Sequence, residues 1–309
     1  VMLIDIIIPA YKPDDKFRKL IEMLEKQTVS VNKIIVINTE EKYMDAFCAG
    51  TRFLSEHKKL SVHHISQREF DHGKSRNMGA KRSDADILVF MTQDAVPANE
   101  YLLEKLVAPL KDESVACSYA RQLPDAGSTM TEKLTREFNY PSNGRVKSKE
   151  DLQELGIKTY FCSNVCCAYN AKIFRELHGF INHTIFNEDM VYAAKAIENG
   201  YRIAYAADAE VIHSHNYSAG QQFHRNFDLG VSQADHPEIF KGVSSESEGI
   251  KMVKETIAKL KKLGYGKEIP NYIVTSGCKF IGYRLGKNYK KLPMWLIRKC
   301  TMNQTYWNR

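Results

Sequence analysis

The chain has 309 residues, of which 43% are hydrophobic, so it can bury one large core and is not a disordered protein. No stretch approaches the roughly 20 apolar residues that span a bilayer, and no N-terminal segment has the pattern of a secretion signal, so we expect a cytoplasmic protein. The net charge of +7 is uneven, because residues 251–309 hold 14 Lys and Arg against Glu255 and Glu268, which makes this tail +12 and the first 250 residues −5.

Short β-rich runs alternate with helical patterns over the first 120 residues. The strand-like runs lie at residues 4–9, 33–38, 61–65, 86–91 and 114–120. Amphipathic stretches such as 15–27 and 99–110 separate them, which is typical of βαβ units and a mainly parallel sheet. Ligands bind beyond the carboxyl ends of the strands in such sheets. The candidate binding loops are therefore PAYKPDD, NTEEK, SQREFDHGKS and TQDAVP.

The remainder of the chain divides into a polar insertion, further α/β elements and a helical tail. Residues 121–160 are rich in turn formers, and we expect them to overhang the sheet beside the binding loops. Strand-like and helical runs follow up to the segment AEVIHSHNYS, and beyond residue 218 the pattern is helical. The sequence therefore predicts an α/β domain over residues 1–217 and a basic, mostly helical extension over residues 218–309.

The seven cysteines are an odd number and lack the paired C-x-x-C spacing of a zinc site. They stand at positions 48, 117, 162, 166, 167, 278 and 300. Because free cysteine is among the most buried residue types, we expect reduced and mostly buried thiols.

A basic segment and a single carboxylate follow two of the predicted strands. In HGKSRNMGAKRS, Gly73 opens a helical pattern with Arg76 in its first turn, which offers free N–H groups and a cation to an anion such as a phosphate. A solvated basic helix start is the alternative. Asp94, in TQDAVP, can hold a divalent cation or can cap an ordinary turn before the proline.

An acidic pair and a histidine pair lie further along the chain. Glu188 and Asp189 meet at the start of a helical pattern, where one acid can act as a general base or both can simply favour the helix dipole. His213 and His215 are two residues apart in a strand-like run, so both can face one metal ion or one phosphate; a purely structural pair is the alternative.

The order of these segments resembles the inverting family 2 glycosyltransferases, over about residues 4–217. The resemblance implies a GT-A type fold, with a mainly parallel Rossmann-like sheet flanked by helices, and a nucleotide-diphospho-sugar donor. It implies donor contacts from Pro9 and Tyr11 in the motif PAY, and from His72, Gly73 and Arg76 in the basic loop.

The family's remaining motifs fall on two further parts of this sequence. Its D-x-D motif falls on Thr92-Gln93-Asp94, which implies a donor contact from Gln93 and a divalent metal ion, Mg²⁺ or Mn²⁺, on Asp94. The family's acid at the end of the second strand, which binds the base, is replaced by Asn38, so the resemblance makes Asn38 the candidate for this nucleotide contact.

The family's acid pair falls on Glu188-Asp189, which implies that Asp189 is the general base. Its later histidine falls on the segment that contains His213 and His215, which implies that these two assist the metal site.

Details of the sequence look most like bacterial rhamnosyltransferases. The segments EFDHG and RN, the segment TQDA and a polar segment that includes Arg121 carry this resemblance, which implies a donor contact from Arg121. It implies dTDP-L-rhamnose as the donor and a growing, lipid-linked cell-surface polysaccharide as the acceptor.

Several alternatives remain at the level of sequence. A sugar-phosphate nucleotidyltransferase would normally have a Gly-rich loop after the first strand, where this chain has PAYKPDD. A non-catalytic homologue that only binds a nucleotide sugar is a second alternative, because Thr92 and Asn38 stand where the family has acids.

The basic tail, in which Phe280, Tyr283, Trp295 and Leu296 are interleaved with Lys and Arg, has two possible roles. It suits the anionic inner face of a membrane, or it suits packing on the catalytic domain or on a second subunit, as in a homodimer. No nucleic-acid motif accompanies it, so we expect no nucleic-acid partner.

Overall fold

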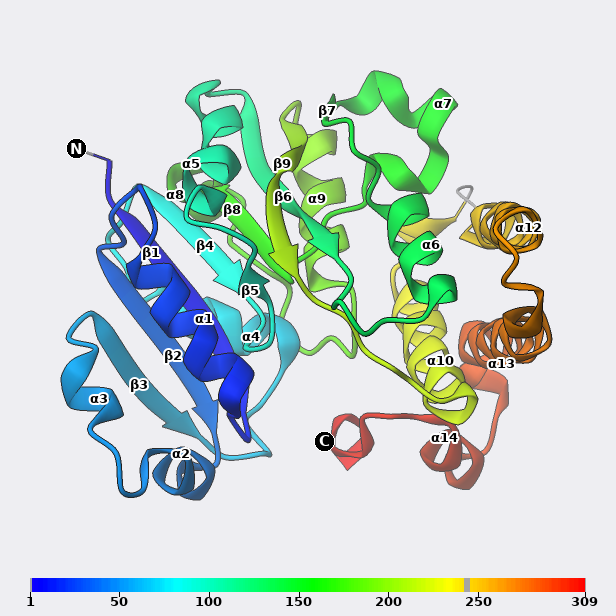
Figure 1. Ribbon diagram of the computed structural model, residues 1–309, viewed down its shortest axis with the longest axis horizontal. Helices are drawn as coiled ribbons and strands as arrows, with labels where there is room; N and C mark the ends of the chain where they lie inside the picture. Colours follow the sequence, from blue (N-terminus) through cyan, green and yellow to red (C-terminus); the bar gives the residue numbers. More distant parts are fainter. Residues whose placement is uncertain (1, 242–244, 309) are drawn as a thin grey trace.

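The computed structural model describes residues 2–241 and 245–308, and within them a nine-stranded sheet lies between helical layers (Figure 1). The strand order is β3-β2-β1-β4-β8-β6-β9-β5, with β7 beside β9. The strands are β1 (Ile4–Tyr11), β2 (Lys33–Thr39), β3 (Leu60–Ile65), β4 (Ile87–Met91), β5 (Val96–Pro97), β6 (Val115–Leu123), β7 (Arg145–Lys147), β8 (Cys166–Asn170) and β9 (Arg202–Ile212). Strands β1, β2, β3, β4, β6 and β9 run in one direction and β5, β7 and β8 run in the other. The predicted α/β fold with a mainly parallel sheet is confirmed.

Helices cover both faces of the sheet because the strand side chains alternate between two apolar clusters. In β1, Ile6 and Ile8 pack into the cluster that includes α1 and α5, whereas Ile7 packs into the cluster that includes α8 and α9. The helices are α1 (Asp15–Glu25), α2 (Glu41–Cys48), α3 (Phe53–Glu56), α4 (His72–Ala80), α5 (Leu102–Val107), α6 (Met130–Asn139), α7 (Leu152–Leu155), α8 (Ala171–Glu176), α9 (Glu188–Glu198), α10 (Ala219–Asp235), α11 (Pro237–Phe240), α12 (Ser245–Lys262), α13 (Ile269–Lys287) and α14 (Met294–Cys300).

The C-terminal helices pack beside the sheet domain, with α10 between the sheet and α13 (Figure 1). Glycines allow α10 and α13 to approach closely: a Cβ at Gly286 would lie 2.0 Å from the Phe227 carbonyl oxygen, and one at Gly282 would lie 2.3 Å from that of Phe223. The predicted helical extension is confirmed, and in the part of the chain that the structure describes no helix has the length and apolar character to cross a membrane. The division into domains 1–217 and 218–309 stays a prediction, and residues 1, 242–244 and 309 of those ranges lie outside the described residues.

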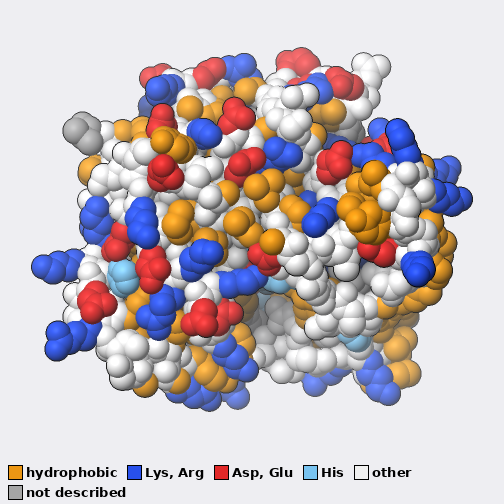
Figure 2. Space-filling view, in the orientation of Figure 1, with side chains coloured by type: hydrophobic (Ala, Val, Ile, Leu, Met, Phe, Trp, Pro, Cys, Tyr) orange, Lys and Arg blue, Asp and Glu red, His pale blue; other side chains and the backbone are white. Residues whose placement is uncertain are grey.

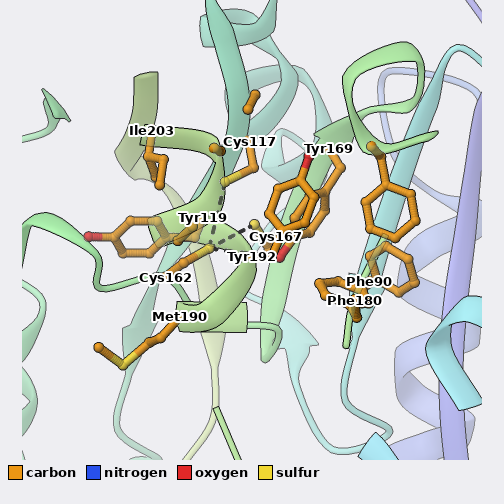
Figure 3. Packing of buried hydrophobic residues seen from close by; sticks show 14 of the residues in the cluster. Phe90, Cys117, Tyr119, Cys162, Cys167, Tyr169, Phe180, Met190, Tyr192 and Ile203 are labelled. Atoms are coloured by element: carbon orange, nitrogen blue, oxygen red, sulfur yellow. Dashed lines mark hydrogen bonds between the residues drawn. The ribbon is translucent and has the colours of Figure 1, made fainter. Parts of the chain in front are cut away.

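Cys117 meets Cys162 and Cys167 in the core, although 45 residues separate Cys117 from Cys162 (Figure 3). The Sγ atom of Cys162 lies 3.8 Å from that of Cys117 and 3.4 Å from that of Cys167, and all three side chains are buried. Burial raises the pKa of the Cys117 and Cys167 thiols. The prediction of mostly buried thiols is confirmed, since only Cys48 and Cys278 are partly exposed. Their spacing in sequence gave no sign that three of them converge.

Candidate functional site

Most of the predicted site residues lie in or beside the segments that follow the carboxyl ends of the strands. The register places the ends of β1, β2 and β3 level with one another, with Tyr11 beside Thr39 and Thr39 beside Ile65. Below the centre of the view in Figure 2, the surface is hollowed between the side of the molecule that carries α1 and the side that carries α10.

Asp94, which follows β4, meets two histidines that follow β9. The Nε2 atom of His213 lies 3.6 Å from Asp94 Oδ1, and the Nε2 atom of His215 lies 3.3 Å from Asp94 Oδ2. Burial lowers the pKa of both imidazoles, that of His213 well below its ordinary value, so both rings are neutral at pH 7. One carboxylate and two neutral imidazoles within 4.8 Å of one another form a donor set that suits a divalent transition metal.

Gln122, at the end of β6, orients His213. Its Oε1 atom lies 3.0 Å from His213 Nδ1, so that nitrogen carries the proton and Nε2 keeps its lone pair toward Asp94. The Gln122 amide also donates to Ser163 Oγ at 3.0 Å, and Arg136 donates to Gln122 Oε1. No motif in the sequence pointed to Gln122 as the residue that orients His213.

Arg121 points away from Gln122 because neighbouring residues of a strand alternate between faces. Its guanidinium lies 3.4 Å from Glu210 Oε1 and donates to the carbonyl oxygen of Tyr140 at 3.3 Å. A donor contact from Arg121 stays a prediction.

Glu188 and Asp189 begin α9 in unequal surroundings. Glu188 is buried, lies 3.2 Å from the Arg76 guanidinium and accepts a hydrogen bond from Asn164 Nδ2 at 3.0 Å. Burial alone would raise the pKa of Glu188, but the charges of Arg76 and His72 outweigh it and hold that pKa below its ordinary value. Burial, followed by the charge of Glu188, raises the pKa of Asp189 to about 8. Glu188 is thus a fixed anion, whereas Asp189 can accept a proton near neutral pH.

The start of α9 is fixed by residues that no motif in the sequence singled out. The Asn164 N–H donates to Asp189 Oδ2 at 2.9 Å, so this asparagine holds both acids. Asn187, in the left-handed region at φ 63°, donates to Ser232 Oγ of α10 at 3.2 Å. Ser232 in turn donates to the carbonyl oxygen of Phe186 at 2.8 Å, so α10 secures the entry into α9.

The start of α4 is already capped. Asp71 Oδ1 accepts hydrogen bonds from the N–H groups of Gly73 and Lys74 at 3.1 and 2.8 Å. A Cβ at Gly73 would lie 1.8 Å from the carbonyl oxygen of Ile181, so glycine is needed here for close packing. The prediction that these N–H groups are free for a phosphate is wrong, and the buried Arg76 supports Glu188 instead.

His72, the first residue of α4, lies beside the acid pair. Burial lowers the pKa of its imidazole, although the charge of Glu188 opposes this shift. The ring packs edge-on against Phe70, with the centroids 5.2 Å apart. A donor contact from His72 stays a prediction.

The end of β1 carries an exposed aromatic platform. Tyr11 packs edge-on against Tyr43 with ring centroids 5.3 Å apart, and Lys12 Nζ lies 5.2 and 5.1 Å from the two centroids. Gln93 pins this end of the strand, since its amide accepts from the Tyr11 N–H at 2.8 Å and donates to the Tyr11 carbonyl at 2.9 Å. Pro9 lies within β1, beside Ile37. The Gln93 side chain is thus occupied by the backbone, and donor contacts from Pro9, Tyr11 and Gln93 stay predictions.

Asn38, at the end of β2, is fully buried. Its Nδ2 atom donates to the carbonyl oxygen of Glu40 at 3.1 Å and lies 3.0 Å from His64 Nδ1. The side chain therefore fixes the loop after β2, and its burial contradicts the predicted direct contact with a nucleotide.

Arg225, on α10, reaches the histidines from the other side. Its guanidinium lies 4.6 Å from the ring centroid of Phe186 and 5.8 Å from that of Tyr217, which stacks on His215 at 4.8 Å. Burial has the largest effect on the pKa of His215 and lowers it, and the charge of Asp94 raises it. The positive charge of Arg225 lowers that pKa further. Arg225 forms no ion pair within the described residues, so it is available to an anionic ligand.

Comparison with known proteins identifies the family. The model of glycosyl transferase family 2 matches residues 5–178. The chain is 40% identical over 311 residues to the O-antigen chain rhamnosyltransferase RfbN of Salmonella typhimurium, covering 99% of this chain and 96% of that protein. It is 38% identical over 308 residues to the O-antigen chain rhamnosyltransferase WbaN of Salmonella anatum, covering 98% of this chain and 95% of that protein.

A solved structure shares the fold. The mannosyltransferase PcManGT from Pyrobaculum calidifontis, in complex with GDP-Man and Mn²⁺, matches with a TM-score of 0.61 at 14% identity, covering 94% of this chain and 88% of that chain. The GT-A type architecture expected from the sequence is thus confirmed, and a sugar-phosphate nucleotidyltransferase is excluded by the family match. The family model matches more than half of the chain and the two relatives match nearly all of it, so this protein belongs to glycosyltransferase family 2.

Proposed function

We propose that this glycosyltransferase moves L-rhamnose from dTDP-L-rhamnose to a hydroxyl group of a growing, lipid-linked cell-surface polysaccharide, with inversion at the anomeric carbon. Support for the sugar and the acceptor comes from the two relatives, whose names describe O-antigen chain rhamnosyltransferases. The observation that carries the chemistry is the acid pair, in which Glu188 is held as an anion and Asp189 has its pKa raised to about 8.

In this proposal the nucleotide base lies on the platform of Tyr11 and Tyr43. An exposed aromatic ring can stack on a base, and the adjacent Lys12 supplies positive charge for the nucleotide. The diphosphate then extends toward Asp94 and the histidines, where the guanidinium of Arg225 has no acidic partner among the described side chains. The positive charge of Arg225 would stabilise the nucleotide diphosphate as it leaves.

We propose that Asp94, His213 and His215 hold a divalent ion, Mn²⁺ or Mg²⁺. The fit rests on two neutral imidazoles that direct Nε2 toward one carboxylate, and on the Gln122 contact that fixes the His213 tautomer. When bound, such an ion would neutralise charge on the diphosphate. PcManGT, which shares the fold, was solved with Mn²⁺ and a nucleotide sugar.

The acceptor hydroxyl would attack the anomeric carbon from the face opposite the diphosphate, in one displacement. Asp189 would take the proton of that hydroxyl, and the two hydrogen bonds from Asn164 to the acid pair would hold the carboxylate in place. A lipid-linked acceptor would place the enzyme at the inner face of the plasma membrane, and the basic C-terminal segment supports this location.

Thermal unfolding with a panel of nucleotide sugars tests the donor and the metal together. A ligand that binds only the native state raises the Tm, so dTDP-L-rhamnose with Mn²⁺ or Mg²⁺ should stabilise the protein more than dTDP-glucose, UDP-GlcNAc or GDP-Man do. Asp94→Ala should abolish the metal-dependent part of the shift. Greater stabilisation by another donor would replace rhamnose in the proposal, and an equal shift with and without metal would remove the proposed ion.

A further inference from the structure

Helices α13 and α14 turn a row of large apolar side chains to solvent. These side chains are between 49% and 61% exposed: Ile273, Val274, Phe280 and Ile281 on α13, and Met294 and Trp295 on α14. On α13 they recur at spacings of seven and eight residues, so they share one face of the helix. Figure 2 shows hydrophobic side chains gathered along the right-hand edge of the molecule, where these helices lie in Figure 1. An exposed apolar surface of this kind marks a contact site.

The same two helices are rich in positive charge. Residues 269–300 contain seven Lys and Arg and no Asp or Glu. Arg284 is paired with Glu246 and Lys290 with Asp235, both from other helices. The exposed Lys291, Arg298 and Lys299 form no ion pair within residues 2–241 and 245–308.

We propose that the six exposed apolar side chains and the surrounding cations form a docking face for an anionic phospholipid surface. Apolar side chains enter the boundary between headgroups and acyl chains, and Lys and Arg contact anionic headgroups. Trp295 is suited to anchor the protein at the membrane interface, because its exposed ring is apolar and a cation lies beside it. Lys299 Nζ is 5.4 Å from the ring centroid.

Charge favours a lipid surface over a second copy of the chain. A symmetric dimer would bring the docking face against the same face of its partner. It would so place Lys291, Arg298 and Lys299, which are unpaired among the described residues, opposite the same three cations of the second copy, with no acid from residues 269–300 between them. A phospholipid surface with net negative charge has no such conflict. The occupant that fits both the apolar and the basic side chains is therefore an anionic membrane.

The structure also defines the docking face more narrowly than the sequence did. Tyr283, which the sequence grouped with Phe280, is only 9% exposed and its hydroxyl donates to Gln233 Oε1 at 2.6 Å. Leu296, which the sequence grouped with Trp295, packs with Phe227 in the apolar cluster beneath α14. Those two residues belong to the packing of the extension and not to its outer face.

The docking face is joined to the candidate site through α10. The Thr301 hydroxyl, just after α14, donates to Asp228 of α10 at 2.6 Å, and His224 Nδ1 lies 2.8 Å from the Cys300 carbonyl oxygen. Further along α10, Ser232 accepts the hydrogen bond from Asn187 that secures the start of α9. Docking would thus hold Asp189 at a fixed distance from the lipid surface. This consequence rests on the proposed function, whereas docking itself does not.

Tryptophan fluorescence tests the docking face directly. The chain has two tryptophans, and Trp307 is partly buried against Tyr289, so Trp307→Phe leaves Trp295 as the sole reporter. In the full-length protein, the emission should shift to shorter wavelength with vesicles of phosphatidylcholine mixed with phosphatidylglycerol, and should not shift with phosphatidylcholine alone. Ile281→Glu should weaken vesicle binding at least ~10-fold, because it removes apolar contact and adds a like charge to the lipid.

Leu54→Glu is the matched control, since Leu54 is 44% exposed on α3 at the opposite end of the molecule (Figure 1). It should leave vesicle binding unchanged. No shift with anionic vesicles, or equal losses for both variants, would overturn the proposal, and a dimer abolished by Ile281→Glu would assign the face to a second copy. The vesicles contain no sugar acceptor, so a negative result leaves the proposed reaction untouched, and donor-induced Tm shifts report on that reaction separately.

Discussion

At the scale of single residues, the site depends on two neighbouring acids with opposite pKa shifts. Arg76 and Asn164 stabilise the charge of Glu188, whereas burial and the charge of Glu188 disfavour the charge of Asp189. The protein thus keeps Asp189 able to accept a proton at the cost of some native-state stability, which is a common trade at active sites.

The raised pKa of Asp189 predicts how stability changes with pH. Its pKa is about 8 in the folded protein and near 3.8 when unfolded, so the folded state binds the extra proton, and stability from this group is lost as pH rises from about 4 to about 8. Asp189→Asn should therefore raise the Tm relative to wild type at pH 8, and much less at pH 4, in thermal unfolding without ligand. Asp208→Asn, at an exposed position of β9, should show no comparable pH-dependent difference, and equal Tm changes in the two variants would contradict the assignment.

Gln122 provides a second prediction at this scale. Gln122→Leu removes the acceptor for the His213 Nδ1 proton, so the ring can adopt the tautomer that blocks Nε2. We expect Mn²⁺ affinity to fall roughly 10–100-fold in a calorimetric titration with donor present. Arg121→Leu changes the neighbouring residue on the opposite face of β6 and should leave that affinity unchanged. If both variants bind the ion as wild type does, Gln122 does not orient the ligand.

At the scale of elements, the crossing of α10 and α13 determines whether the extension is held against the catalytic domain. Gly286 lies where the backbones nearly touch, and a Cβ there would meet the carbonyl oxygen of Phe227. Backbone atoms cannot move aside as the end of a flexible side chain can, so the helices would have to separate.

Gly286→Ala should therefore lower the free energy of unfolding by about 1–3 kcal/mol, measured by chemical denaturation. Gly277→Ala is the control on the same helix, because no atom lies within 4 Å of its added Cβ. It should stabilise the protein by roughly 0.5–1 kcal/mol through helix propensity alone. Stabilisation by both substitutions would show that the close crossing is absent.

At the scale of the whole molecule, periodicity in the sequence was sufficient to predict the sheet and the loops that carry the site. Strand-like runs ended where β1, β2, β3 and β4 end, within a few residues, because buried strands must be continuously apolar. The convergence of Asp94 with His213 and His215 was implied by the resemblance to the family and not by periodicity.

Side-chain contacts across the fold could not be predicted in the same way. The free N–H groups expected at Gly73 are occupied by Asp71, which stands two residues earlier and caps the helix. Asn164 meets Glu188 across 24 residues of sequence, and the meeting of Cys117 with Cys162 spans 45, so neither contact leaves a local pattern. Gln122 contacts His213, whereas the neighbouring Arg121 contacts Glu210 on the other face of β6. The polar segment that contains both residues does not show which of them points to the histidines.

The central claim is that Asp189 is the general base of a rhamnosyl transfer, and the rate of dTDP release from dTDP-L-rhamnose in the presence of acceptor-bearing membranes tests it most directly. Asp189→Asn should lose at least ~100-fold in turnover with donor affinity roughly unchanged, since general-base catalysis contributes about 100- to 10,000-fold. Asp208→Asn should retain wild-type turnover. Near-normal turnover of Asp189→Asn at saturating donor would contradict the account.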